Sequence, residues 1–199
     1  MIKKIRNIIT VMLLMGAGTL SAQAQTYFEP AAKDVVTPTG LQKNVSRSTD
    51  IVMLALPVAT LAGVLIERDW DGLVQGIETA GATAAATLIL KYAVSERRPD
   101  GSDMHSFPSA HSAVSFATAA FLQRRYGWAF GAPAYALAAY VGWGRVYSGK
   151  HHWWDVVAGG AIGAASAYIF TKPFAKKHNL QVSPVSDGRS VGVYASMEF

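Results

Sequence analysis

The chain has 199 residues, of which 51% are hydrophobic and 16% charged, and it contains no cysteine. The length corresponds to one domain, and the lack of cysteine excludes disulfide bonds and thiol catalysis. The formal net charge is +5, but Lys3, Lys4 and Arg6 supply three of these charges, so the charge balance does not indicate a nucleic-acid-binding surface.

Residues 1–24 have the features of a secretory signal peptide. A basic start precedes an apolar run from Ile8 to Leu20, and Ala22-Gln23-Ala24 matches a small-x-small cleavage site. The short run and this motif favour cleavage over an uncleaved anchor. Residues 25–49 are polar, with two prolines and little periodicity, so we expect an exported, loosely structured lead-in.

Five apolar segments follow and predict an all-α helical bundle within residues 50–178. They extend over Ile51–Ile66, Gly72–Val94, Ser109–Gln123, Trp128–Trp143 and Trp153–Thr171. Several have only 16 to 19 residues and are rich in alanine and glycine, which is marginal against the about 20 residues that span a bilayer. Either a small transmembrane bundle or a soluble periplasmic helical domain fits this pattern. Glu78 inside the second segment is costly in lipid unless it faces the bundle interior.

Charge placement favours the transmembrane bundle. With the N-terminus outside, alternating segments bring the basic residues at two segment ends to the cytoplasm, as the positive-inside rule requires; these are Arg124, Arg125, Lys172, Lys176 and Lys177. Tryptophans at segment ends are typical of an aromatic belt. On the last segment, Gly159, Gly160 and Gly163 suit close helix packing within the fold, with dimerisation as the alternative.

The tail, residues 179–199, has a different pattern. Gln181–Ser186 and Ser190–Glu198 alternate in polarity on either side of Asp187-Gly188, which predicts a short C-terminal β-hairpin. We assign no function to this hairpin, and a single hairpin cannot close a barrel.

Three clusters of polar residues lie at the ends of the apolar segments. They are Lys91 with Arg98-Pro99, then Pro108-Ser109-Ala110-His111, then Arg145 with His151 and Asp155. Cations and hydroxyls neutralise phosphate oxygens, while one imidazole can attack phosphorus and another can protonate the leaving oxygen. The combination therefore indicates a phosphoryl site, which the alternating topology would assemble on the periplasmic side.

The spacing within each cluster predicts local structure. Lys91 and Arg98 share one face if their helix continues, and Pro99 predicts where it ends. His151 and Asp155 are four residues apart, so on a helix the carboxylate lies beside the ring and fixes its tautomer. Ser109 is expected to cap a helix whose first N–H groups can bind an anion. Taken singly, each cluster also has a purely structural explanation, such as a solvated helix end.

The ordered pattern Lys91-x6-Arg98-Pro99, Pro108-Ser109-Ala110-His111 and Arg145-x5-His151-x3-Asp155 resembles the signature of the type-2 phosphatidic acid phosphatase (PAP2-like) superfamily. That superfamily includes bacterial class A acid phosphatases and vanadium haloperoxidases. The resemblance implies that His151 is a nucleophile forming a phosphohistidine, that Asp155 orients it, and that His111 is the general acid. It implies that the phosphate oxygens are held by Lys91, Arg98, Ser109, Arg145 and the backbone near Ala110.

Two positions depart from the usual pattern. Ala110 stands where the family usually has glycine, and Gly144 stands where a serine usually precedes the arginine. Neither change touches the residues that are expected to make and break bonds. We therefore expect an active enzyme whose affinity for phosphate is the property most affected.

We expect a phosphatase of the bacterial inner membrane with its site facing the periplasm. Candidate substrates, by resemblance, are undecaprenyl pyrophosphate, phosphatidylglycerol phosphate, phosphatidic acid and lipid A phosphates; no nucleic acid is an expected partner. We expect no cofactor and no metal, because Lys91, Arg98 and Arg145 supply the positive charge. The alternatives are a soluble periplasmic acid phosphatase and an inactive phospholipid-binding membrane protein; a haloperoxidase would need a larger scaffold. The residues do not indicate an oligomeric state.

Overall fold

The protein is represented by a computed structural model that describes residues 37–174, 181–186 and 191–196. The predicted signal peptide and residues 25–36 of the predicted lead-in lie outside the described residues.

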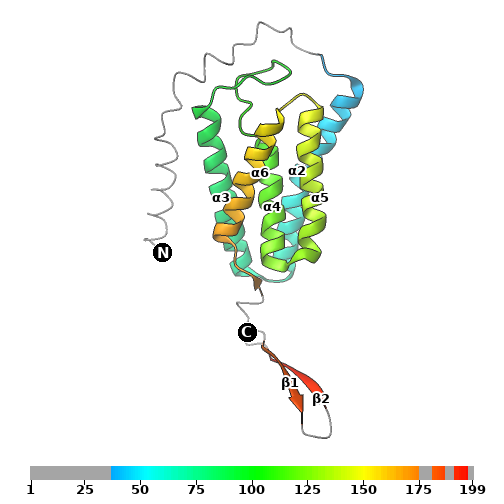
Figure 1. Cartoon of the computed structure of the whole chain (residues 1–199), viewed down its shortest axis with the longest axis vertical. Coiled ribbons are helices and arrows are strands. Elements are labelled where there is room, and N and C mark those ends of the chain that lie inside the picture. Colours follow the sequence, from blue (N-terminus) through cyan, green and yellow to red (C-terminus); the bar gives the residue numbers. More distant parts are fainter. Residues whose placement is uncertain (1–36, 175–180, 187–190, 197–199) are drawn as a thin grey trace. The chain divides into compact units, whose positions relative to one another are not determined.

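The described residues contain five helices, which run up and down as a bundle (Figure 1). This arrangement confirms the predicted all-α bundle. They are α2 (Gly40–Ile66), α3 (Trp70–Ala93), α4 (Ala110–Tyr126), α5 (Trp128–Tyr147) and α6 (Trp153–Phe170). Helix α4 packs against each of the other four, and its most extensive contacts are with α6 and α5. The centre of the bundle is therefore α4, the helix that begins with the Pro-Ser-Ala-His cluster.

Helix α2 begins at Gly40 rather than at Ile51, so the prediction of a loose lead-in was wrong for residues 40–49. A capping box starts the helix: the Thr39 hydroxyl accepts from the Gln42 N–H, and the Gln42 side chain accepts from the Thr39 N–H. The added turns pack on α5, where Thr49 is fully buried. Packing on a neighbouring helix thus stabilises a polar stretch that has no apolar periodicity of its own.

Small residues let α6 approach α4 closely. A Cβ atom on Gly159 would collide with the Ser109 carbonyl oxygen, and one on Gly163 would collide with the Ala113 carbonyl oxygen. The prediction that the glycine face serves packing within the fold is confirmed. The buried core is accordingly built mainly from alanines, namely Ala113, Ala117, Ala119, Ala120, Ala134, Ala138 and Ala167.

The large apolar side chains lie mostly on the outside of the bundle. Leu54, Val58, Ile77 and Ile89 are each more than half exposed, the reverse of a soluble helical bundle. Helices α2 and α3 are long and apolar enough to cross a membrane, and few residues of their apolar windows are buried. Glu78 is exposed on α3, so its side chain does not face the bundle interior.

A buried ion pair lies at the end of the bundle where α2 and α4 finish and α3 begins. Asp69 caps the N-terminus of α3 by accepting from the Gly72 N–H, and it also pairs with the buried Arg125 of α4. The Tyr126 hydroxyl donates to the same carboxylate at 2.8 Å. This network joins the turn between α2 and α3 to the end of α4.

Strands β1 (Gln181–Ser186) and β2 (Val191–Ser196) pair antiparallel, with Gln181 opposite Ser196 and Ser186 opposite Val191. The predicted turn at Asp187-Gly188 lies outside the described residues.

Candidate active site

The three polar clusters meet at the end of the bundle where α3 and α5 finish and α4 and α6 begin (Figure 1). Loops 94–109 and 148–152 complete this end. The alternating-segment topology predicted this convergence, and each predicted site residue lies in or beside these loops and helix ends.

His151 and Asp155 are close, but not in the predicted way. His151 precedes α6, which begins at Trp153, and Asp155 lies in its first turn. The Asp155 Oδ2 atom is 3.5 Å from the His151 Nδ1 atom, longer than a well-formed hydrogen bond. The helical i,i+4 arrangement was therefore wrong, because the chain turns at His152; the carboxylate still faces the ring nitrogen expected of an orienting group.

Ser106 is a site residue that the sequence patterns did not reveal. Its hydroxyl donates to Asp155 Oδ2 at 2.5 Å, and the backbone N–H of His152 donates to the same oxygen at 2.8 Å. Ser106 and Asp155 are both fully buried. Two hydrogen-bond donors from two different loops thus hold the Asp155 carboxylate in place beside the His151 ring.

Arg98 reaches the site from a loop and not from a helix. Helix α3 ends at Ala93, so the prediction of a helix face shared by Lys91 and Arg98 was wrong. The loop folds back on itself, with Arg98 N–H bonded to the Asp103 carbonyl, and the Asp103 carboxylate accepts from Arg98 Nε at 2.8 Å. Arg98 Nη1 then lies 3.4 Å from His151 Nε2, facing the nitrogen that Asp155 leaves free.

Lys91 and Ser109 are engaged with the surrounding chain. Lys91 Nζ donates to the carbonyl oxygens of His105 and Pro108 at 2.9 and 3.0 Å. Ser109 is the N-cap of α4, as predicted, and its oxygen accepts from Ser112. Ser109 is fully buried. In this structure both residues hold the loop before α4.

Arg145 and His111 both contact Asp50 of α2, a residue for which the sequence patterns predicted no role. The Oδ1 atom of Asp50 lies 2.9 Å from Arg145 Nη1 and 2.9 Å from His111 Nε2. Arg145 Nη1 also approaches the Ser46 hydroxyl at 3.4 Å. Helix α2 thereby contributes to the site through residues of its unexpected first turns.

Two loops are braced against each other beside the site. The Asp100 N–H donates to the Gly149 carbonyl at 3.0 Å, and Lys150 Nζ donates to the Asp100 carboxylate at 2.8 Å. Burial alone would raise the pKa of Asp100, but hydrogen bonds from Lys150 and Ser102 lower it below its usual value. The Asp100 carboxylate is therefore ionised at neutral pH, and its contacts with Gly149 and Lys150 hold the loop of Arg98 against the loop of His151.

Burial sets the protonation state of His151. Removal of the ring from water lowers the pKa of His151, the charges of Arg98 and Arg145 lower it further, and Asp155 opposes them. The ring is therefore neutral at pH 7, the state in which an imidazole nitrogen can act as a nucleophile.

One group of side chains in the described part of the chain has the composition of a metal site. Glu96, His152 and Asp155 bring potential ligand atoms within 4.8 Å of one another. The oxygens are already engaged, since Glu96 Oε1 accepts from Trp154 Nε1 at 2.7 Å and Asp155 Oδ2 accepts from Ser106. His152 stacks on Trp154. This arrangement fits a hydrogen-bonded cluster better than a cation site.

The two departures from the family pattern have different surroundings. Gly144 lies where α2 crosses α5, and a Cβ atom there would collide with the Thr49 side chain. Glycine at this position is what lets the first turns of α2, with Asp50, approach the site. Ala110 is the first residue of α4, where the added methyl group is compatible with the helix.

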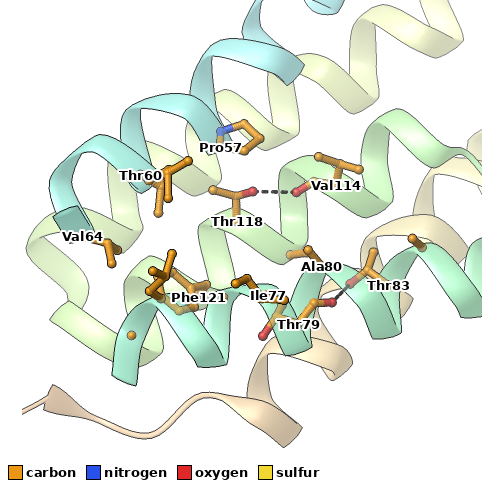
Figure 2. A pocket seen from close by; sticks show the side chains of 16 residues that line it. Pro57, Thr60, Val64, Ile77, Thr79, Ala80, Thr83, Val114, Thr118 and Phe121 are labelled. Atoms are coloured by element: carbon orange, nitrogen blue, oxygen red, sulfur yellow. Dashed lines mark hydrogen bonds between the residues drawn. The ribbon is translucent and has the colours of Figure 1, made fainter. Parts of the chain in front are cut away.

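An apolar pocket of about 290 Å³ lies between α2, α3 and α4 (Figure 2). Four threonines line it, but Thr60, Thr83 and Thr118 each donate their hydroxyl to a carbonyl of their own helix. Thr79 lies within hydrogen-bonding distance of Thr171. Because these hydroxyls are satisfied, the threonines present mainly methyl groups, and the pocket suits a hydrocarbon chain.

Comparison with known proteins gives a family for this arrangement. The sequence profile of the PAP2 superfamily matches residues 72–178, more than half of the chain. A Helicobacter pylori protein described as lipid A 4'-phosphatase is 31% identical over 144 residues, covering 63% of this chain and 69% of that protein. A Porphyromonas gingivalis lipid A 1-phosphatase is 35% identical over 77 residues, which is 37% of this chain and 17% of that protein.

Two crystal structures have similar folds. The phosphatidylglycerolphosphate phosphatase of Bacillus subtilis, described as a transmembrane PAP2-type enzyme, matches with a TM-score of 0.54 and 25% identity, over 81% of this chain and 91% of that one. Aquifex aeolicus LpxE matches with a TM-score of 0.53 and 20% identity, over 70% of this chain and 98% of that one.

Proposed function

The chain belongs to the PAP2 superfamily, in its membrane lipid phosphatase branch, and from that premise we propose that it hydrolyses a phosphorylated envelope lipid through a phosphohistidine on His151. The observation that carries the proposal is the environment of that ring. His151 is buried, its Nδ1 side faces Asp155, and its Nε2 atom lies beside Arg98.

In the proposed reaction, His151 Nε2 attacks phosphorus and the bond to the lipid oxygen breaks. His111 gives its proton to that oxygen, and Asp155 stabilises the charge that develops on the His151 ring. Water then attacks the phosphohistidine, returns a proton to His111 and releases inorganic phosphate. Arg98, Arg145, Lys91, Ser109 and the first N–H groups of α4 near Ala110 are the proposed phosphate ligands.

The apolar pocket supports a lipid substrate. Its lining residues Pro57, Thr83 and Val114 lie on the helices that carry Asp50, Lys91 and His111, at separations of seven, eight and three residues. At about 1.5 Å rise per residue, the pocket begins about 5–12 Å from the site along the helices. A phosphate held at the site thus leaves an attached acyl chain within reach of the pocket.

Among phosphorylated lipids we propose lipid A as the first candidate. The two curated relatives are described as lipid A phosphatases. The Bacillus subtilis structure keeps phosphatidylglycerol phosphate as the second candidate, because that enzyme is described as acting on it. The exposed apolar surface of α2 and α3 supports placement in the inner membrane, and we propose that the site faces the periplasm.

Phosphate release by the purified protein in detergent tests this proposal. The panel is lipid A, phosphatidylglycerol phosphate, phosphatidic acid and undecaprenyl pyrophosphate, with a water-soluble phosphomonoester as the non-lipid comparison. We expect lipid A to be hydrolysed fastest and His151→Ala to release no phosphate while keeping the thermal transition of the wild type. Equal rates on the soluble ester would overturn the lipid assignment, and an active His151→Ala would overturn the mechanism.

We propose that the reaction is independent of metal, because arginine and lysine supply the neutralising charge. Activity should survive an excess of EDTA. Loss of activity with EDTA, followed by recovery on adding a divalent ion, would instead assign a metal to the Glu96, His152 and Asp155 group.

A further inference from the structure

Asp50 occupies a position that the proposed reaction needs for the substrate. Its Oδ1 atom contacts Arg145 Nη1 and His111 Nε2, both at 2.9 Å. These are the distances at which a phosphate oxygen would accept from the same two groups. A carboxylate and a phosphate are both anions with oxygen acceptors, so Asp50 is placed as a substitute for the substrate.

Asp50 and the phosphate of the substrate cannot use the donors of His111 and Arg145 at the same time, because too few hydrogens are available. A histidine Nε2 atom can carry one hydrogen, so His111 cannot donate it to Asp50 and to a lipid oxygen at the same time. Arg145 Nη1 carries two hydrogens, and its recorded neighbours are Asp50 and Ser46. A phosphate that used these two donors would also meet the negative charge of Asp50 at contact distance.

The surroundings of Asp50 differ from those of a permanently positioned carboxylate. Asp155 is fully buried and is held by Ser106 and the His152 N–H. The Asp50 side chain is 48% exposed, and within the described residues its recorded partners are Arg145 and His111 alone. A half-exposed carboxylate can turn toward water at low cost, because water replaces the lost hydrogen bonds.

We infer that Asp50 is an internal anion that holds Arg145 and His111 in the empty site and leaves both of them when the phosphate of the substrate binds. In the absence of substrate the carboxylate accepts hydrogen bonds from both groups, and it competes with phosphate for them. This inference rests on the proposed function, because it takes Arg145 and His111 to be the groups that meet the substrate.

The test is the affinity of the full-length protein in detergent for inorganic phosphate and for vanadate, measured by calorimetry without turnover. Asp50→Asn keeps the shape of the side chain and removes its charge. We expect it to bind both anions about three- to tenfold more tightly than the wild type, which corresponds to the loss of the competing ion pair with Arg145. Asp50→Ala should show the same direction of change. A gain in affinity cannot arise from a damaged site.

Glu67→Gln is the matched control, because it removes the same charge from an exposed residue at the opposite end of α2, and its anion affinity should equal that of the wild type. Unchanged or weaker anion binding by Asp50→Asn would overturn the inference. A lower kcat with an unchanged KM would also overturn it and make Asp50 a fixed positioning group for His111. If the wild type hydrolyses no lipid phosphate but Asp50→Asn still binds anions more tightly, the proposed function is wrong. The inference that Asp50 competes with anions for Arg145 and His111 is then still supported.

Discussion

At the scale of single residues, the site depends on contacts that no local motif encodes. Ser106 and Asp155 are 49 positions apart, and Asp50 and Arg145 are 95 apart. The family signature predicted the residues at the centre, and it missed Ser106 and Asp50 because serine and aspartate have no distinctive spacing there. The cation–histidine clusters were predictable because each lies at the end of an apolar segment.

Ser106 should act through Asp155. Ser106→Ala removes one hydrogen bond to a charged group, which contributes about 1.5–3 kcal/mol, so we expect kcat/KM to fall about ten- to hundredfold. Asp155→Asn should cost more and leave a weak residual activity. In the Asp155→Asn background the additional Ser106→Ala change should have little effect, because the two residues act as one unit. Independent, multiplying losses would contradict this dependence.

The lowered pKa of His151 predicts the acid limb of the pH profile. The neutral ring is the active form, so kcat/KM should fall only as the pH drops below the ordinary histidine value of about 6.5. Asp155 favours the protonated ring, so Asp155→Asn should move this limb to still lower pH. Protonation of the substrate phosphate cannot explain a shift of the acid limb between the two proteins, because both act on the same substrate. A limb that stays fixed or moves upward would show that another group controls it.

At the scale of helices, the apolar segments predicted the number of helices and most of their ends. The bounds of α3 to α6 lie close to the predicted segments, because proline, glycine and charged residues interrupt the apolar runs. The start of α2 was not predictable in the same way. Its first turns are polar, and they are helical because Thr39 and Gln42 cap them and because Gly144 leaves room for Thr49.

The buried pair between Asp69 and Arg125 should be the main electrostatic contribution to stability at its end of the bundle. Asp69→Asn leaves a buried arginine without its counter-charge, at a cost of about 3–5 kcal/mol. We expect a large fall in the thermal transition in detergent, with normal kcat for the protein that remains folded, since this pair lies at the end opposite the site. Glu67→Gln, an exposed neighbour, should change the transition little. Equal effects of the two variants would mean that the pair is not stabilising.

At the scale of the whole molecule, Arg124, Arg125 and Lys172 lie at the end of the bundle opposite the candidate site. Two of the basic residues are engaged there, Arg125 with Asp69 and Arg124 over the ring of Tyr168. The end that carries Arg124 and Arg125 is the one proposed to face the cytoplasm.

Single cysteines test this orientation, because the chain has no cysteine of its own. Ser102→Cys places a thiol in the exposed loop beside the site, and Glu67→Cys places one in the turn between α2 and α3. In intact spheroplasts an impermeant thiol reagent should modify the first, and it should modify the second only after permeabilisation. Vanadate should inhibit hydrolysis in the same intact spheroplasts. The opposite labelling pattern would invert the orientation without affecting the phosphatase chemistry.

The alanine-rich core has a thermodynamic consequence. The heat capacity of unfolding comes chiefly from apolar surface that becomes hydrated, at about 12–15 cal/mol/K per residue in soluble domains. Here the interior consists mainly of alanines, and many of the leucine and isoleucine side chains already face outward in the folded bundle. Calorimetry in detergent should therefore give a smaller heat capacity change per residue than in soluble domains, and the free energy of unfolding should vary more nearly linearly with temperature.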